Sequence, residues 1–133
     1  MTVKVYNLTR QKVSVGEIKK AVEDVLRQNG KAGAEVNVIL VGEKRIQNLN
    51  RLYRDKDEVT DVLSFEVGEG NWPQAPDDKD FLGEVFICLA WAGRQAKELG
   101  HSRKKELADL TAHGVLHLLG WTHRQMEEKG WGI

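Results

Sequence analysis

Three of the four histidines in this chain stand close together near its C-terminus, in the segment LTAHGVLHLLGWTHRQ (residues 110–125). A helix turns by about 100° per residue, so His113 and His117, four residues apart, can point two imidazoles at one ion. Gly120 follows the last apolar residue of the segment, where helices commonly end with a left-handed glycine. The chain can turn there and bring His123 to a third ligand position.

Three histidine ligands with an open fourth position are typical of a catalytic zinc site. Structural zinc sites are usually closed by four ligands, most of them thiolates. A single histidine is more often a core or surface residue without a metal, but three of the four histidines at this spacing favour a metal site. We therefore predict that His113, His117 and His123 bind one Zn²⁺ ion.

The spacing matches the zinc-peptidase pattern His-Glu-x-x-His-x-x-Gly-x-x-His at every position except the glutamate, where this chain has Gly114. That glutamate is the general base of the peptidases, and glycine has no side chain that could accept a proton. Glycine inside a helix costs about 1 kcal/mol relative to alanine. Gly114 is explained either by close packing of the helix or by room for a substrate near the ion.

The hydrophobic pattern predicts the elements that must position these histidines. Segments rich in β-branched residues predict four strands, over residues 3–8, 34–41, 60–67 and 83–90. Apolar residues at helical spacing predict four helices, over residues 14–28, 43–54, 91–100 and 102–119, with Ser14 and Ser102 as N-caps. The polar segment GEGNWPQAPDDKD contains both prolines and is expected to be a long loop.

Length and composition fit a single domain that spans residues 1–133. Apolar residues make up 41% of the chain and charged residues 30%, as in an ordinary globular protein. We expect an α+β fold with a four-stranded mixed sheet and packed helices. The last long helix would carry two of the metal ligands, as in the zincin-like metal helix His-Gly-x-x-His-x-x-Gly-x-x-His.

Charge and hydropathy restrict the partners. Lys and Arg total 20, as do Asp and Glu, so nucleic-acid binding would need a local basic patch. No apolar run approaches the ~20 residues that span a bilayer, and the N-terminal residues lack the apolar core of a signal peptide. The single cysteine, Cys88, cannot form an internal disulfide, which fits a reducing cytosol. We therefore expect a cytoplasmic protein with no membrane partner.

Three blocks of the sequence resemble the YbeY family. HGVLHLLGWTH (113–123) is similar to the family signature His-Gly-x-Leu-His-Leu-x-Gly-x-Asp-His. LNRLYRDKDEVTDVLSF (49–65) resembles the family segment Leu-Asn-x-x-Tyr-Arg…Thr-Asp-Val-Leu-Ser-Phe, and LGEVFIC (82–88) resembles its strand Leu-Gly-Asp-Ile-x-Ile. The resemblance covers roughly residues 35–123. Thr122 stands where the family usually has aspartate, so we expect an acceptor near the metal ligands to be absent.

The resemblance implies a metal-dependent, single-strand-specific endoribonuclease that acts in ribosomal RNA processing and ribosome quality control. The implied partners are single-stranded RNA, ribosomal RNA and the small ribosomal subunit; action on DNA is not predicted. The resemblance also implies that the three histidines bind the metal and that Arg54 has a catalytic or substrate-binding role. The residue types agree, because an arginine fork suits a phosphoryl group and zinc can lower the pKa of bound water to ~7.

Two alternatives stay open. One is a zinc-dependent peptidase or other metallohydrolase, against which the missing glutamate counts. The other is a non-catalytic ribosome-assembly factor in which the metal stabilises the fold. The open fourth ligand position disfavours this second alternative, but Thr122 in place of aspartate leaves it possible. No residue is assigned as the general base.

Overall fold

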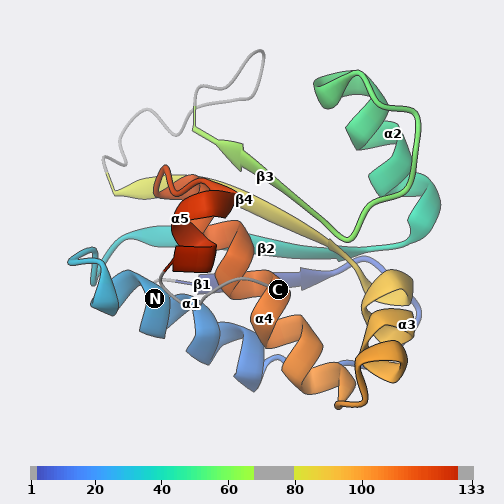
Figure 1. Cartoon of the computed structure of the whole chain (residues 1–133), viewed down its shortest axis with the longest axis horizontal. Coiled ribbons are helices and arrows are strands. Elements are labelled where there is room, and N and C mark those ends of the chain that lie inside the picture. Colours follow the sequence, from blue (N-terminus) through green and yellow to red (C-terminus); the bar gives the residue numbers. More distant parts are fainter. Residues whose placement is uncertain (1–2, 68–79, 129–133) are drawn as a thin grey trace.

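The structure is a computed structural model of the chain, and it describes residues 3–67 and 80–128, with the side chains of His123 and Glu127 excepted. The long loop expected between the third and fourth strands lies outside the described residues, apart from its last residue, Asp80. In the described part, elements follow one another in the order β1, α1, β2, α2, β3, β4, α3, α4, α5 (Figure 1).

The four predicted strands and four predicted helices are present, with ends shifted by a few residues. The strands are β1 (Val3–Asn7), β2 (Glu35–Val41), β3 (Val62–Glu66) and β4 (Phe81–Cys88). The helices are α1 (Gly16–Gln28), α2 (Glu43–Arg54), α3 (Leu89–Leu99), α4 (Arg103–Leu118) and α5 (His123–Glu128). The short helix α5 was not predicted.

The two predicted N-caps have different outcomes. Ser102 caps α4, since its side-chain oxygen accepts a hydrogen bond from the Lys105 N–H at 3.1 Å. Ser14 does not cap α1, because the N-cap is Val15 and no side chain there bonds to the helix. Lys19 N–H instead donates to the Val15 carbonyl, so the main chain alone starts α1.

The strands form one mixed sheet in the order β1-β2-β4-β3, as expected for an α+β fold. The pairs β1–β2 and β2–β4 are parallel, and β3 runs antiparallel to β4 with Ser64 opposite Val85. Parallel neighbours need a crossover connection, which α1 supplies between β1 and β2. The antiparallel strand β3 therefore lies at one edge of the described sheet, next to β4.

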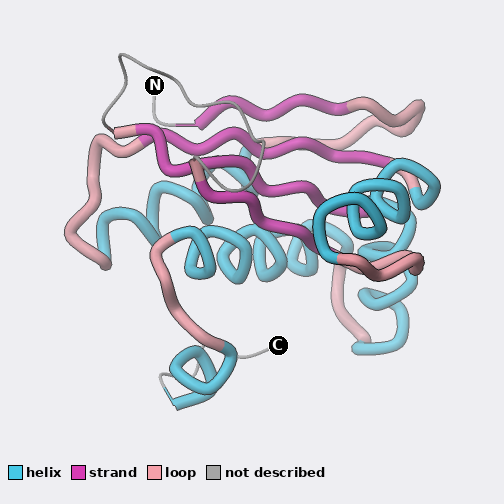
Figure 2. The backbone as a smooth tube through the Cα atoms, turned by 90° about the horizontal axis from the view of Figure 1, so that it is seen from above, coloured by secondary structure: helices cyan, strands magenta, loops and turns pink. Residues whose placement is uncertain are grey.

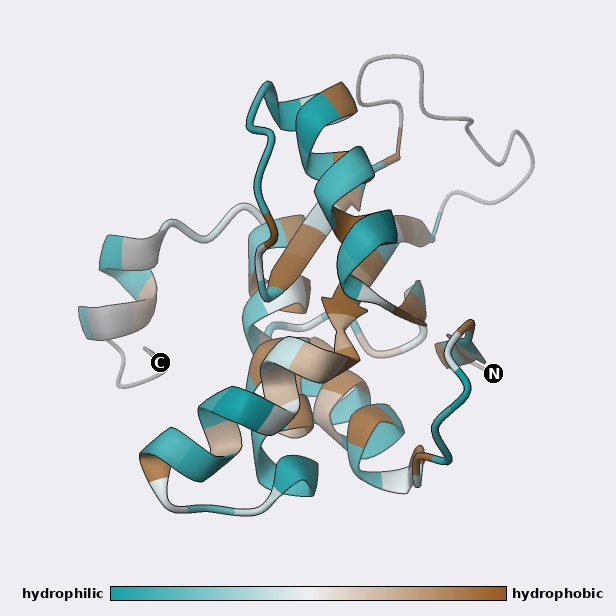
Figure 3. Ribbon diagram, turned by 90° about the vertical axis from the view of Figure 1, so that its right-hand side faces the viewer, coloured by the Kyte–Doolittle hydropathy of each residue, from teal (hydrophilic) through white to brown (hydrophobic). Residues whose placement is uncertain are grey.

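The sheet separates two hydrophobic clusters. Figure 2 shows the strands as one layer with long helices beneath it, and the larger cluster lies where α1 and α4 cover the sheet. The smaller cluster lies on the opposite face, where Ile46 of α2 packs with Phe65 and Phe86. Figure 3 shows mainly hydrophobic residues along the central strands and mainly hydrophilic residues along α2. Within the described residues, no helix combines the length and apolar character needed to cross a bilayer.

Helix α4, which carries two of the predicted metal ligands, is largely buried. Leu107, Leu110, Val115 and Leu116 of this helix are all at most 2% exposed. The helix contacts α1, α3, β3 and β4, so apolar and small residues occupy most of its circumference. Side chains on α4 therefore have fixed surroundings, which is a condition for placing functional groups accurately.

Candidate metal and phosphate site

The structure brings His113 and His117 together on one face of α4. Their ring centroids are 4.8 Å apart with an interplanar angle of 66°. His113 is buried, with 8% of its surface exposed, and His117 is half-buried. Two imidazoles at this separation can contribute ligands to one ion, so the donor set fits zinc as far as these two residues are concerned. Their metal binding remains a prediction.

Helix α4 ends just after His117 in a Schellman motif. Gly120 has a left-handed φ of 89°, as predicted. Its N–H donates to the His117 carbonyl at 3.0 Å, and the N–H of Trp121 donates to the Leu116 carbonyl at 3.0 Å. The chain turns here and starts α5 at His123. The side chain of His123 lies outside the described part of the structure, so its predicted ligand role is untested.

Thr122 is the cap of α5. Its Oγ1 accepts a hydrogen bond from the Gln125 N–H at 3.2 Å, and its own N–H donates to Gln125 Oε1 at 2.8 Å. Thr122 Oγ1 therefore serves the backbone of α5, and the absence of an acceptor beside the metal ligands stays a prediction. The signal in the sequence was Thr122-x-x-Gln125, which is a capping-box pattern.

Gly114 is explained by close helix packing. A Cβ atom at this position would lie 2.5 Å from Val85 Cγ1 and 3.2 Å from Ser64 Oγ. The α4 backbone therefore rests directly on β3 and β4, and Ser64 Oγ donates a hydrogen bond to the Gly114 carbonyl at 2.9 Å. A glutamate at this position, as in the zinc peptidases, would have no space for its side chain.

Arg54 is the last residue of α2, and its guanidinium lies against β3. Nη2 donates to the Ser64 carbonyl at 2.7 Å, Nη1 donates to the Tyr53 carbonyl at 3.2 Å, and Cζ lies 4.7 Å from the centre of the Phe65 ring. Ser64 thus contacts Arg54 through its backbone and Gly114 through its side chain. A single residue of β3 connects the predicted phosphate-binding arginine to the predicted metal helix.

The turn after α2 fixes the position of Arg54. Asp55 adopts a left-handed conformation with φ 58°, which ends the helix. Asn50, only 3% exposed, donates from its side chain to the Glu58 carbonyl at 3.0 Å. The Lys56 N–H also donates to the Asn50 carbonyl at 3.2 Å. Asn50 therefore ties the end of α2 to the turn that leads into β3.

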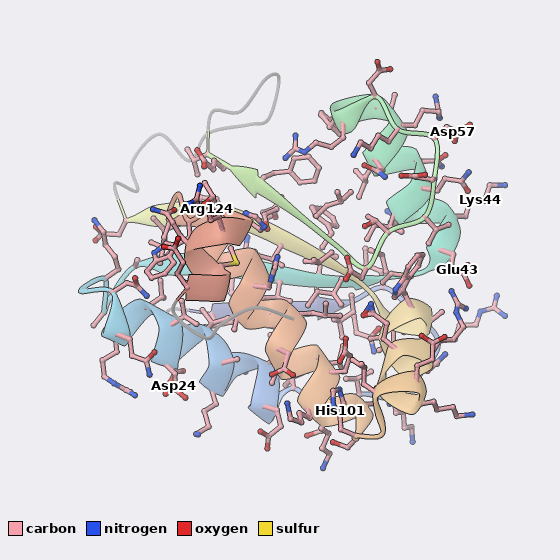
Figure 4. All side chains as sticks on the ribbon, in the orientation of Figure 1. Asp24, Glu43, Lys44, Asp57, His101 and Arg124 are labelled. Carbon is pink, nitrogen blue, oxygen red and sulfur yellow. The ribbon has the colours of Figure 1, made fainter. Side chains whose placement is uncertain are left out.

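A second group of ionisable side chains lies where α3 meets α4 (Figure 4 labels His101). Ligand-type atoms of His101, Glu106 and Asp109 lie within 4.8 Å of one another, which would allow a metal ion. However, His101 Nε2 is 2.6 Å from Glu106 Oε1, and Lys105 Nζ is 2.8 Å from Asp109 Oδ2. Both carboxylates thus have nitrogen partners, and the group is explained by a His101–Glu106 hydrogen bond and a Lys105–Asp109 ion pair at a helix corner. Glu106 is fully buried, which the hydrophobic pattern of the sequence does not predict.

The chain is similar to known proteins over most of its length. The family model described as Endoribonuclease YbeY matches residues 4–130. The chain is 43% identical to Endoribonuclease YbeY of Desulforamulus reducens, over 97% of this chain and 88% of the relative. It is 48% identical to that of Carboxydothermus hydrogenoformans, over 90% and 82%. A solution structure from Thermotoga maritima matches with a TM-score of 0.59 and 29% identity, over 91% of this chain and 74% of that one.

Proposed function

The chain belongs to the YbeY family of endoribonucleases, enzymes that hydrolyse RNA phosphodiester bonds, and from this premise we propose how its site works. We propose that it cleaves single-stranded ribosomal RNA of the small ribosomal subunit, in the cytoplasm. In this proposal His113, His117 and His123 hold a zinc ion, and Arg54 holds the phosphate. The observation that carries the proposal is the contact of Ser64 with both Arg54 and the histidine helix.

The residues present suit zinc. The paired rings of His113 and His117 provide two imidazole donors from α4, and the helix corner after them leads the chain to His123, the third proposed ligand. Zinc held there would act as an electrophile toward a phosphoryl oxygen and lower the pKa of bound water. Neutral imidazoles leave the charge of the ion uncompensated, which favours an anionic phosphodiester over a neutral peptide.

Arg54 supplies the second positive charge of the proposed site. Its guanidinium is planar and always charged, and it can bind two phosphoryl oxygens at once. The Ser64 carbonyl and the Phe65 ring orient it before any substrate arrives. A preoriented cation stabilises the negative charge that develops on the phosphoryl oxygens without a cost of reorganisation during the reaction.

The packing of Gly114 disfavours the peptidase alternative. A general base at position 114 would need a side chain, but Val85 Cγ1 would lie 2.5 Å from its Cβ. The other alternative, an assembly factor with a structural metal, predicts that loss of the metal lowers stability and that Arg54 has no catalytic effect. The two alternatives therefore differ from the proposal in what an arginine substitution does.

The test is the substitution Arg54→Ala, with cleavage of a labelled single-stranded ribosomal RNA fragment as the assay. Loss of one well-placed electrostatic donor should lower the cleavage rate by about 10²–10³-fold. Arg54→Lys should recover only part of the rate, because an ammonium group cannot reproduce a two-pronged contact. Zinc content should stay at the wild-type level, since a guanidinium is not a metal ligand.

Arg51→Ala is the matched control, because Arg51 is an exposed arginine on the same helix one turn earlier. Arg54→Ala also loses the hydrogen bond to Ser64 and the contact with Phe65, so the free energy of unfolding should fall by about 1–2 kcal/mol. Assays must therefore run well below the melting temperature of the variant. A folded, zinc-loaded Arg54→Ala protein that cleaves at the wild-type rate would remove Arg54 from the mechanism.

The single-strand preference needs its own comparison. The same ribosomal RNA sequence, presented once as a single strand and once in a duplex, should be cleaved only in the single strand. Binding to purified small ribosomal subunits, measured by co-sedimentation, tests the proposed partner. Cleavage of the single strand without binding to subunits would support the chemistry and contradict the partner.

A further inference from the structure

The corner between α4 and α5 is hydrogen-bonded on both sides. On the α4 side, Gly120 and Trp121 donate their N–H groups to carbonyls of the last helical turn. On the α5 side, Thr122 and Gln125 exchange two hydrogen bonds, of 2.8 and 3.2 Å, and the Met126 N–H donates to the Thr122 carbonyl at 3.1 Å. The path from α4 to α5 thus has a defined backbone conformation.

Helix α5 depends on this corner more than a longer helix would. The first N–H groups of any helix lack partners inside the helix. A helix of six residues is also too short to be stable by its own propagation. Two supports are visible: the reciprocal bonds of Thr122 and Gln125, and the side chain of Met126, which is 0% exposed within the main core cluster.

His123 is the residue directly after Thr122, at the first position of α5. Its backbone is the first that the cap of α5 holds in helical conformation. By contrast, His113 and His117 are fixed within a long buried helix and need no such device. Of the three proposed ligands, His123 is therefore the one whose placement depends on a local support.

We propose that Thr122 is a positioning residue for the metal site: by capping α5 with Gln125, it holds His123 in place relative to His113 and His117 before metal binds. This inference rests on the proposed metal role of the three histidines. Preformed placement means that metal binding does not have to order the corner. Loss of the cap should weaken metal affinity, even though Thr122 is not itself a ligand.

The experiment measures zinc affinity by competition with a chromogenic chelator, in the full-length protein. Thr122→Val keeps the shape of the side chain and removes the acceptor. Its zinc Kd should rise by about 10–100-fold, the usual effect of losing a partner that orients a ligand. Thr122→Ser and Thr122→Asp retain a capping acceptor and should bind zinc almost as tightly as wild type.

Ser102→Ala is the matched control. Ser102 caps α4 with one hydrogen bond of 3.1 Å, at the end of the helix remote from the histidines. This variant should lose about as much thermal stability as Thr122→Val and leave the zinc Kd unchanged. A second readout is amide hydrogen exchange of Gln125 and Met126 in metal-free protein, which should accelerate in Thr122→Val and stay as in wild type in Ser102→Ala.

His123→Ala distinguishes the proposed metal site from the proposed positioning role of Thr122. If it binds zinc as tightly as wild type does, the proposed metal site is wrong and the positioning role is overturned with it. If His123→Ala loses affinity but Thr122→Val does not, the metal site stands and only the positioning role is overturned. An equal loss of zinc affinity in Thr122→Val and Ser102→Ala would also overturn it, since the effect would then be one of general stability.

Discussion

Replacing Gly114 by alanine should destabilise the protein, although glycine is normally the poorer residue in a helix. The added Cβ would lie 2.5 Å from Val85 Cγ1, 3.1 Å from Val85 Cγ2 and 3.2 Å from Ser64 Oγ. Val85 is branched at Cβ and has little freedom to rotate away. The helix and the strand must therefore move apart, or Val85 must leave its preferred rotamer.

The expected size follows from three contributions. Overpacking of this kind costs about 1–3 kcal/mol. Displacing the hydrogen bond of 2.9 Å between Ser64 Oγ and the Gly114 carbonyl costs about 1 kcal/mol more. The better helix propensity of alanine returns about 1 kcal/mol. The free energy of unfolding should thus fall by roughly 1–3 kcal/mol, from the sum of these terms.

Gly93 provides the matched control. It lies inside α3, and a Cβ atom there would meet nothing within 4 Å. Gly93→Ala should therefore stabilise the protein by about 1 kcal/mol through helix propensity alone. Urea unfolding followed by tryptophan fluorescence measures both variants under the same conditions.

A double-mutant cycle identifies the clash. Val85→Ala removes the two methyl groups that a Cβ at position 114 would meet. In that background Gly114→Ala should cost about 1–2 kcal/mol less than in the wild-type protein. If Gly114→Ala stabilises the protein as much as Gly93→Ala does, the close contact between α4 and β4 is not as described, and the packing explanation of Gly114 falls.

Two further predictions concern buried groups. Burial raises the pKa of the Cys88 thiol, so native protein should react with iodoacetamide much more slowly than urea-unfolded protein, and equal rates would contradict this. Because the folded state favours the protonated thiol, this contribution to stability is present at neutral pH and is lost as pH rises through the alkaline range. His101→Ala should lower the free energy of unfolding by about 2 kcal/mol, because it removes a partner of the fully buried Glu106, whereas His101→Gln should lower it less. Urea unfolding checks this, and a wild-type midpoint for His101→Ala would contradict it.

Much of the fold follows from hydrophobic periodicity, because most elements bury one face. The long helix of the histidines is predictable from its apolar residues and from the Ser102 cap, and its end from Gly120. Helix α5 is not, since six residues, of which only Met126 is buried among the described side chains, give no periodic pattern. Its only local signal is the capping pair that begins at Thr122.

The site is predictable where it depends on neighbours in sequence and not where it depends on tertiary contacts. The approach of His113 and His117 follows from helical spacing, and their rings do lie together. The contacts of Arg54 with β3 could not be derived from spacing, because they depend on how α2 docks against the sheet. The burial of Glu106 beside His101 is likewise a tertiary effect, since charged residues in a sequence are expected at the surface.

Because β3 lies at the edge of the described sheet, it can open separately from the rest of the fold. β2 and β4 each have neighbours on both sides, but β3 is joined to the described sheet through β4. Local opening of an outer strand generally needs less free energy than global unfolding. Arg54 donates a hydrogen bond to the backbone of β3, whereas His113 belongs to α4. Opening of β3, which would also break the smaller hydrophobic cluster around Phe65, would separate Arg54 from His113 while the larger cluster stays folded, so we expect heat to lower activity reversibly below the melting temperature.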